Sequence, residues 1–547
     1  MSPRPRITSK LTQVRNAVLG MLLVPFRWFS PTLQLLIGFA LLGTFTTLLL
    51  SRWPIRLDLG LLGRAGLVLA AYLVVWQFVA YRAGAVDLSI TKRRAFALVG
   101  SAVLVETTVM RLGFMVAAGL SAQSTHPAMS DPAVLSYAIP FAAASLLVTM
   151  LIDKQLGLIA GAIASVFAGL LSPAGVPMAL YAFISCSAAV YGIKRYRERQ
   201  SVTLAGLVVA GVNCVTALAL LVFSQHPAKL STALVAAGCG IGGGLLTIIF
   251  AAGGVPINES LFGILTDIRL LELSNADLPV LSQLALRAPG TNQHSHAVGQ
   301  LAEDACRAIG ANALLARIGS LYHDIGKVAA PDYFVENQSG INPHDRLRPV
   351  QSAKIITSHV TYGLRLAKEI GLPDRVADFI PQHHGTRTLH FFLRKAEDQA
   401  ANGEKICEGD FRYPGPKPQF REVAILMLAD SCEAAARSLA HPDPESIKAI
   451  VSRIFDAVLS DGQLDECNLT LRELSDIREA MVTSLVAIYH GRIDYPGFNI
   501  PTPPDTRPGP TYADEAAEPQ GVTYQQPSDI PINPAGEVED EAFTRKP

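Results

Sequence analysis

The sequence predicts an all-α protein with two parts, a polytopic helical membrane domain followed by an all-helical cytoplasmic domain. Three observations support this prediction. Half of the 547 residues are hydrophobic and only 17% are charged, against about 25% in typical soluble domains. The apolar excess lies before residue 255. Residues 290–500 combine apolar and charged residues at helical spacing, and no run alternates as a half-buried strand would.

The apolar half of the chain contains about eight stretches long enough, or nearly so, to span a membrane. A helix needs roughly 20 apolar residues to cross the hydrocarbon core. We therefore predict a transmembrane domain of about eight helices over residues 32–253. The predicted spans are 32–51, 61–81, 95–119, 133–152, 155–172, 174–193, 202–224 and 229–252. The pair on either side of Pro173 is equally compatible with one re-entrant hairpin, which keeps the same parity.

Basic residues orient this domain. Residues 1–31 form a basic N-terminus with five Lys or Arg and no acidic residue. The loops 82–94 and 194–199 are also basic, whereas 120–132 contains no Lys or Arg. Basic loops stay on the cytoplasmic side, so an even number of spans places both the N-terminus and the C-terminus in the cytoplasm. We interpret the first span as an anchor, because no small-residue cleavage signature accompanies it.

Beyond the membrane domain the character of the sequence changes twice. Residues 254–289 are amphipathic and predict a linker helix, which leads into the helical cytoplasmic domain over 290–500. Residues 501–547 are Pro-rich and acidic without apolar periodicity, which predicts a disordered tail. Over the whole chain 46 basic residues balance 46 acidic ones, so nothing indicates binding to a nucleic-acid polymer.

Eight of the 12 histidines lie between residues 290 and 395. Neutral imidazole is a common ligand of divalent cations, but a single histidine is usually an ordinary core or surface residue. The helical register separates the two cases. His294 lies on the apolar face that Val298 and Leu301 form, whereas His296 faces water. His344 lies in a loop rich in Pro and Asn, and we do not predict it as a ligand.

The same reasoning selects side chains on the buried faces or at the ends of other apolar helices. The full inward-facing set is His294, His323, Asp324, His359, His383, His384 and Asp430. Such a set is too large for one tetrahedral zinc ion and suits two divalent metal ions bridged by Asp324. Mixed histidine and carboxylate ligands favour Fe or Mn, leave Co and Zn open, and argue against Ca. For Asp430 the alternative is a buried salt bridge.

Two metal ions a few ångströms apart can activate water and stabilise both the attacking and the leaving oxygens of phosphoryl hydrolysis. We therefore predict a metal-dependent phosphohydrolase site with Asp324 and Lys327 as its catalytic residues. Lys327 lies one turn beyond Asp324, where its charge could stabilise a phosphate. The alternative for Lys327 is a solvated helix end.

The motifs around these residues resemble a known family. Tyr322-His323-Asp324-Ile325-Gly326-Lys327, with His294 upstream and Asp430 downstream, is similar to the signature of the HD-domain phosphohydrolases. Other segments resemble more narrowly the seven-transmembrane-receptor HD family, the PgpH-type bacterial cyclic-di-AMP phosphodiesterases. These segments include Pro289-Gly290-Thr291, Glu336-Asn337-Gln338 and Gln382-His383-His384-Gly385-Thr386. The resemblance covers roughly residues 130–500.

The resemblance implies that residues 290–500 are an HD domain that hydrolyses cyclic di-AMP to the linear dinucleotide pApA, in a multi-pass protein of the bacterial inner (plasma) membrane. It assigns His294, His323, Asp324 and Asp430 to one metal and Asp324, His359, His383 and His384 to the other. The related cyclic-di-GMP hydrolases carry a Gly-Tyr-Pro signature after the paired histidines. Here Gly385-Thr386-Arg387 follows instead, which favours the adenine dinucleotide.

Two alternative functions stay open. One keeps the HD chemistry but changes the substrate to cyclic di-GMP, another cyclic dinucleotide or a nucleoside triphosphate. The other is a non-catalytic membrane receptor that binds a nucleotide without turnover. A homodimer, or a signalling partner that acts through the membrane domain, also stays open beside the cyclic dinucleotide and the lipid bilayer. Glu106 and Arg111, inside the span 95–119, are candidates for signal input or for pairing between helices.

Overall fold

The computed structural model describes residues 30–51, 53–85, 90–193, 200–224, 229–400, 406–439 and 442–489. Within these ranges the regular structure is helical, with one isolated β-bridge between Thr388 and Arg412. The all-α prediction is therefore confirmed. Most of the predicted basic N-terminus and the whole predicted disordered tail, 501–547, lie outside the described residues.

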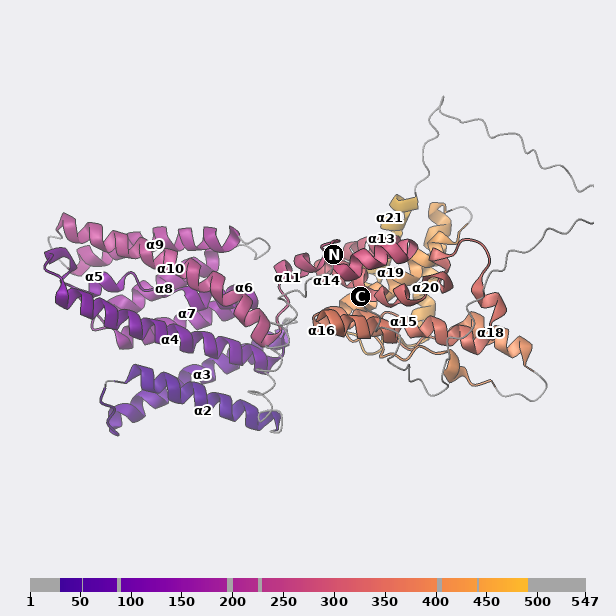
Figure 1. The fold of residues 1–547 in the computed structure, drawn as a ribbon. Helices are drawn as coiled ribbons and strands as arrows, with labels where there is room; N and C mark the ends of the chain where they lie inside the picture. Colours follow the sequence, from indigo (N-terminus) through magenta and orange to yellow (C-terminus); the bar gives the residue numbers. More distant parts are fainter. Residues whose placement is uncertain are drawn as a thin grey trace, which may run out of the picture. The chain divides into compact units, whose positions relative to one another are not determined.

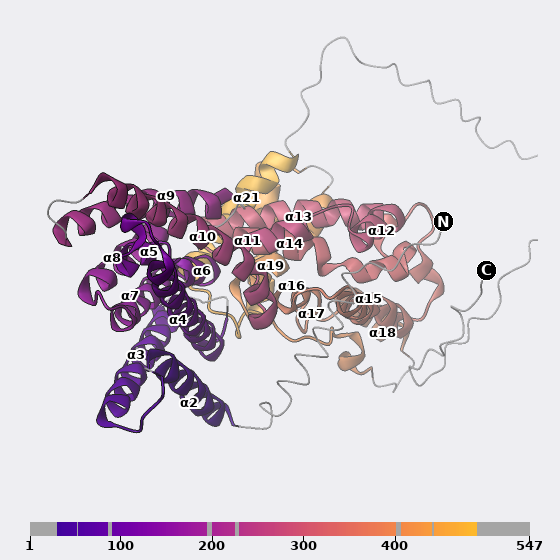
Figure 2. The same cartoon turned by 60° about the vertical axis from the view of Figure 1, so that its left-hand side comes forward.

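The membrane part is a set of helices that pack side by side (Figures 1 and 2). Six helices of the described ranges are long and apolar enough to cross a membrane. They are α2 (Pro31–Leu50), α3 (Leu59–Ala85), α4 (Lys92–Gln123), α7 (Lys154–Leu171), α9 (Gln200–Ser224) and α10 (Leu230–Phe262). A further apolar helix, α8 (Val176–Gly192), has 17 residues and follows α7 after a short turn.

The predicted single span over 133–152 is wrong, because the chain breaks there. It forms α5 (Pro132–Ser136) after the short helix η1 (Pro127–Met129), then a run of turns around Pro140, and then α6 (Ala143–Leu151). Proline has no N–H to donate to a preceding turn. Glu106 of α4 accepts a hydrogen bond from the Ala144 N–H at 3.1 Å and so caps the new helix. The break is buried in protein, where irregular backbone at membrane depth is tolerated.

The predicted linker helix over 254–289 also needs correction, since that segment contains the end of one helix and two short ones. Gly263 adopts a left-handed conformation, with φ of 65°, and terminates α10. Thr266 then caps α11 (Asp267–Leu273) by accepting the Arg269 N–H. Helix α12 (Pro279–Arg287) begins with a proline, which is well suited to the first turn.

The C-terminal part is an all-helical bundle around α19 (Arg421–Arg437), whose run Val423–Ala429 is completely buried. Around α19 pack α13 (Pro289–Ala308), α14 (Ala313–His323), α20 (Pro444–Ser460) and α21 (Leu471–Tyr489), as Figure 1 shows. The remaining helices are α15 (Pro349–Ile370), α16 (Asp374–Ala377), α17 (Phe379–Gln382) and α18 (His390–Gln399). Short 3-10 turns are η2 (Ile325–Ala329), η3 (Pro331–Tyr333), η4 (Val335–Asn337), η5 (Pro343–Arg346) and η6 (Glu408–Phe411). Leu270 of α11 and Leu281 and Leu284 of α12 join the same core.

Candidate metal centre

Five helices bring the seven side chains that the sequence singles out into one place. His294 lies in α13, His323 ends α14, His359 lies in α15 and Asp430 lies in α19. Asp324 follows α14 directly, and His383 and His384 follow α17. All are buried except His384, whose side chain is 21% exposed. Residues more than 130 positions apart in the sequence therefore share one buried centre.

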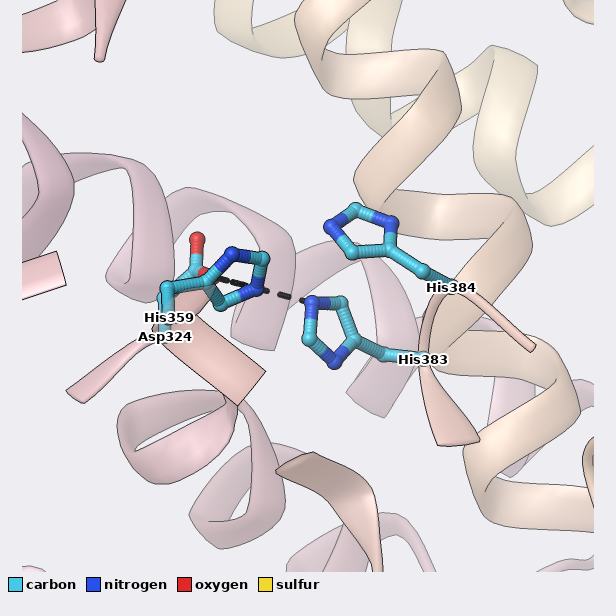
Figure 3. Close-up of side chains that lie close together, drawn as sticks. All are labelled: Asp324, His359, His383 and His384. Carbon is cyan, nitrogen blue, oxygen red and sulfur yellow. Dashed lines mark ion pairs between the residues drawn. The ribbon is translucent and has the colours of Figure 1, made fainter. Parts of the chain in front are cut away.

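The seven side chains form two groups with Asp324 between them. Asp324, His359, His383 and His384 place one ligand atom each within 4.8 Å of one another, and so do His294, His323 and Asp430. Asp324 Oδ1 lies 3.4 Å from His359 Nε2 and 3.6 Å from His383 Nε2 (Figure 3). Asp324 Oδ2 faces the other group, at 3.1 Å from His323 Nε2 and 3.9 Å from His294 Nε2. Each oxygen of this carboxylate thus faces a different group.

Three histidines are held in the tautomer that a metal ion requires. The Nδ1 atoms of His323, His359 and His383 lie 2.6–2.8 Å from the backbone carbonyls of Ser320, Ile356 and Ile380. Since a carbonyl only accepts, each Nδ1 carries the proton and each Nε2 presents a lone pair. These three Nε2 atoms and Asp324 Oδ1 are buried and have no hydrogen-bond partner among the described residues. Unpartnered buried acceptors are costly, and a divalent cation would satisfy all four.

Electrostatics keeps most of this donor set ready to bind a cation. Burial lowers the pKa of His359 to about 4, and burial together with the neighbouring His383 holds the pKa of His384 well below its usual value. Both rings are therefore neutral near pH 7. Although burial favours the protonated acid, the neighbouring His323 and the charged Lys327 hold the pKa of Asp324 well below its usual range. The carboxylate between the two groups is thus ionised.

His294 differs from the other histidines because carboxylates contact both of its ring nitrogens. Nε2 lies 2.9 Å from Asp430 Oδ1, and Nδ1 lies 2.5 Å from Glu433 Oε2. Burial opposes protonation, but these hydrogen bonds raise the pKa of His294 to about 9. Arg437 in turn pairs with Glu433 one turn along α19. Glu433 therefore orients the ring so that Nε2 points at the centre, as carboxylates beside metal-binding histidines do.

Replacing Glu433 by glutamine is expected to lower affinity for divalent metal by roughly 10–100-fold, the usual cost of losing such a support. Titration calorimetry of the full chain with Mn²⁺ measures it. Glu303→Gln is the matched control, because Glu303 is also buried but pairs with Arg307 and Arg317 at the surface. An affinity within threefold of wild type in Glu433→Gln would show that the carboxylate does not support the centre.

A glycine sets the distance between Asp324 and His359. In the turn η2, a Cβ on Gly326 would lie 1.9 Å from the His359 carbonyl oxygen and 2.7 Å from the Gly363 nitrogen. Both are backbone atoms of α15, which cannot move aside as a flexible side chain can. Only glycine therefore lets the turn after α14 lie directly on α15.

Gly326→Ala is expected to destabilise the fold by about 1–3 kcal/mol through overpacking and to weaken metal binding by moving Asp324 away from His359. Urea unfolding and Mn²⁺ titration report the two effects. Gly409→Ala serves as the control, since the nearest atom to its added Cβ would be 3.6 Å away. Unchanged stability and unchanged metal affinity in Gly326→Ala would contradict the close approach.

Lys327 lies at the edge of the centre and is not a solvated helix end. Its side chain is 11% exposed, and its ammonium contacts Asp324 Oδ2 at 2.7 Å and Glu336 Oε1 at 2.8 Å. A cavity of about 400 Å³ opens in front of the two groups. Lys327, His294, His359, His384 and Asp430 reach its surface, and its walls include the aromatic side chains Tyr333, Phe334, Phe391, Phe392 and Tyr413.

Neither of the two histidines that the sequence excluded belongs to the two ligand groups of the described residues, although His344 also lines the cavity. His296 is exposed, as its helical register predicts. His344 is buried, but its Nε2 donates a hydrogen bond to the Tyr333 carbonyl at 2.9 Å and therefore offers no lone pair to a metal ion. The sequence analysis gave Glu433 no role and noted Glu336 only within the family-like segment Glu336-Asn337-Gln338. Glu433 follows Asp430 by three positions, so their shared helix face was the available signal.

The chain is similar to several known proteins. Residues 58–266 match the family described as 7TM receptor with intracellular HD hydrolase, and residues 291–435 match the HD domain. Cyclic-di-AMP phosphodiesterase PgpH of Bacillus subtilis (strain 168) is 39% identical over 372 residues, which is 66% of this chain and 52% of that protein. The PgpH of Listeria monocytogenes serotype 1/2a (strain 10403S) is 41% identical over 318 residues, 58% and 44% of the two chains.

The crystal structure of the L. monocytogenes phosphodiesterase PgpH HD domain in complex with cyclic-di-AMP is 46% identical in sequence. It covers 40% of this chain and 100% of that chain, with a TM-score of 0.38. The chain spans about half the length of the curated relatives that it matches. Its apolar helices and the match to the 7TM family make it a multi-pass membrane protein.

Proposed function

Because the chain belongs to the family of 7TM receptors with an intracellular HD hydrolase, we propose that it is a membrane-bound phosphodiesterase that hydrolyses cyclic di-AMP to pApA. We further propose that it uses two divalent metal ions, Fe or Mn, and lies in the bacterial plasma membrane with both termini in the cytoplasm. The observation that carries the proposal is that the two carboxylate oxygens of Asp324 face two separate groups of candidate ligands.

The donor set fits divalent metal ions, because buried acceptors converge at Asp324 without a partner among the described residues. We assign one ion to His294, His323, Asp324 and Asp430, and the other to Asp324, His359, His383 and His384. When bound, the ions would supply an activated water and Lewis-acid stabilisation of the phosphoryl oxygens. Imidazole nitrogens and carboxylate oxygens together suit Fe and Mn better than Ca, which binds oxygen ligands.

The other residues of the cavity act on the substrate itself. Lys327 holds its ammonium at the cavity surface beside Asp324, where it stabilises the negative charge that develops on a phosphoryl oxygen. The aromatic side chains of the cavity walls offer surfaces on which nucleobases can stack. Unpaired bases commonly bind proteins in this way. Buried placement of the ligands excludes bulk water and so strengthens these electrostatic interactions.

The adenine dinucleotide is the substrate that we favour among HD substrates. Two relatives that are 39% and 41% identical to the chain are named cyclic-di-AMP phosphodiesterases. The chain also has Gly385-Thr386-Arg387 after the paired histidines, in place of the Gly-Tyr-Pro signature of the related cyclic-di-GMP hydrolases.

The test is to incubate the full chain, reconstituted in nanodiscs with Mn²⁺ or Fe²⁺, separately with cyclic di-AMP, cyclic di-GMP and dGTP. Mass spectrometry of the products is expected to show pApA as the main product. Preferential turnover of cyclic di-GMP or dGTP would show that the protein is a hydrolase with a different substrate. Metal-loaded protein that binds a nucleotide without turning over any of the three would support a receptor instead.

A further inference from the structure

Lys327 lies between two carboxylates that have different tasks. Its ammonium is 2.7 Å from Asp324 Oδ2 and 2.8 Å from Glu336 Oε1. Asp324 belongs to the candidate metal centre, and the same Oδ2 atom faces His323 Nε2 at 3.1 Å. Glu336 belongs to neither ligand group, although it also reaches the cavity. The ammonium and a metal ion would therefore compete for one oxygen of Asp324.

A hydrogen-bond network holds the Glu336 side chain in place. The network joins two sequence motifs to which no other role has been assigned. The Thr291 hydroxyl donates to Glu336 Oε1 at 2.8 Å, and the Thr291 N–H donates to Asn337 Oδ1 at 3.1 Å. Asn337 Nδ2 donates back to the Thr291 hydroxyl at 2.8 Å. A Cβ on Gly290 would lie 1.9 Å from the Glu336 carbonyl oxygen, so glycine is needed where α13 begins. Pro289-Gly290-Thr291 and Glu336-Asn337 thus form one clamp around the Glu336 carboxylate.

The clamp matters because charge at Asp324 changes when metal binds. A cation held by Asp324 would repel the ammonium and would remove one of its two negative partners. Like charges a few ångströms apart in a buried site interact strongly. Because Thr291 holds Glu336 in place, the Lys327 ammonium keeps a carboxylate partner at the cavity surface. It can then stay in the site without competing with the metal for Asp324.

We propose that Glu336 is a positioning residue: it holds Lys327 at the cavity surface and frees Asp324 for the metal. The inference rests on the proposed function only in assigning Lys327 to the phosphate. Its effect on metal binding is independent of the substrate. Without Glu336, Lys327 has Asp324 as its remaining carboxylate contact and competes with the metal for it.

The test is a double-mutant cycle with Glu336→Gln and Lys327→Met in the full chain, measuring Mn²⁺ affinity in the absence of nucleotide. Glu336→Gln alone is expected to weaken Mn²⁺ binding by roughly 10-fold or more, as outer partners of metal ligands do. In the Lys327→Met background the same change is expected to alter affinity by less than about threefold, because the competing ammonium is gone. Non-additivity of this kind is what a direct coupling produces.

Turnover of cyclic di-AMP at saturating Mn²⁺ is the second readout. Glu336→Gln is expected to lower kcat by roughly tenfold, and to cause no further loss once Lys327 is methionine. Glu422→Gln is the control, since Glu422 is comparably buried but accepts the Asn312 N–H at 2.8 Å, away from the cavity. It should leave Mn²⁺ affinity and kcat unchanged.

Equal loss of Mn²⁺ affinity in both backgrounds would overturn the proposal, because Glu336 would then act on the metal through its own charge. Unchanged affinity in Glu336→Gln would overturn it as well. If wild-type protein turns over no nucleotide, the proposed function fails, yet the Mn²⁺ cycle still decides the role of Glu336.

Discussion

Replacing Asp324 by asparagine is expected to lower turnover of cyclic di-AMP by at least about 10³-fold, equivalent to about 4 kcal/mol of transition-state stabilisation. The two carboxylate oxygens face different ligand groups, at 3.4 Å from His359 Nε2 and 3.1 Å from His323 Nε2. An amide of the same shape keeps one acceptor oxygen but presents an NH₂ donor to the other group. One metal position loses its Asp324 oxygen, and the centre loses a negative charge.

Steady-state kinetics on the full chain and metal analysis of the same sample test this prediction together. The expected Asp324→Asn protein is folded and retains at most half of the wild-type metal content. Asp374→Asn is the control, because Asp374 is exposed at the start of α16 and outside the cavity. Turnover within tenfold of wild type in Asp324→Asn would contradict a bridging role for this residue.

Removing metal is expected to abolish turnover and to lower the thermal stability of the C-terminal helical part. The buried Nε2 atoms of His323, His359 and His383 have no other partner among the described residues, so their desolvation is offset only when metal is bound. A ligand at 100 times its dissociation constant stabilises the native state by about 2.7 kcal/mol. For a domain of this size each kcal/mol shifts Tm by roughly 2–4 °C, so a shift of several degrees is expected.

Dialysis against a chelator, followed by activity and calorimetry, measures both effects, and Mn²⁺ or Fe²⁺ is expected to restore them where Ca²⁺ does not. Asp324→Asn provides the internal control, since chelation should change its Tm much less than that of wild type. Full activity in metal-free protein, or an unchanged Tm, would show that the histidine and carboxylate cluster has a purely structural role.

The helical architecture could be predicted because its signals are local. Apolar runs of about 20 residues define α2, α3, α9 and α10. The break between α5 and α6 could not be predicted in this way. Residues 133–152 are as apolar as a continuous span, and the capping carboxylate of Glu106 comes from a different helix. The two short helices α11 and α12 were merged because each is only part of one amphipathic stretch.

The histidines of the site could be predicted from the sequence, because a histidine on an otherwise apolar helix face is expected to be buried. His294 and His359 lie on faces that are otherwise apolar, and both are buried. Glu336 gives no such signal, since it lies in a polar segment of short turns. Its contact with Thr291 joins residues 45 positions apart, and only the folded chain brings them together.

The proposed function requires that Asp324 join two metal positions in one catalytic centre. The most direct measurement is the Mn²⁺ stoichiometry of the purified full chain combined with its electron paramagnetic resonance spectrum. We expect two equivalents of Mn²⁺ with an exchange-coupled spectrum, and loss of the coupling in Asp324→Asn. One equivalent, or two ions whose spectrum is uncoupled and unaffected by Asp324→Asn, would contradict it.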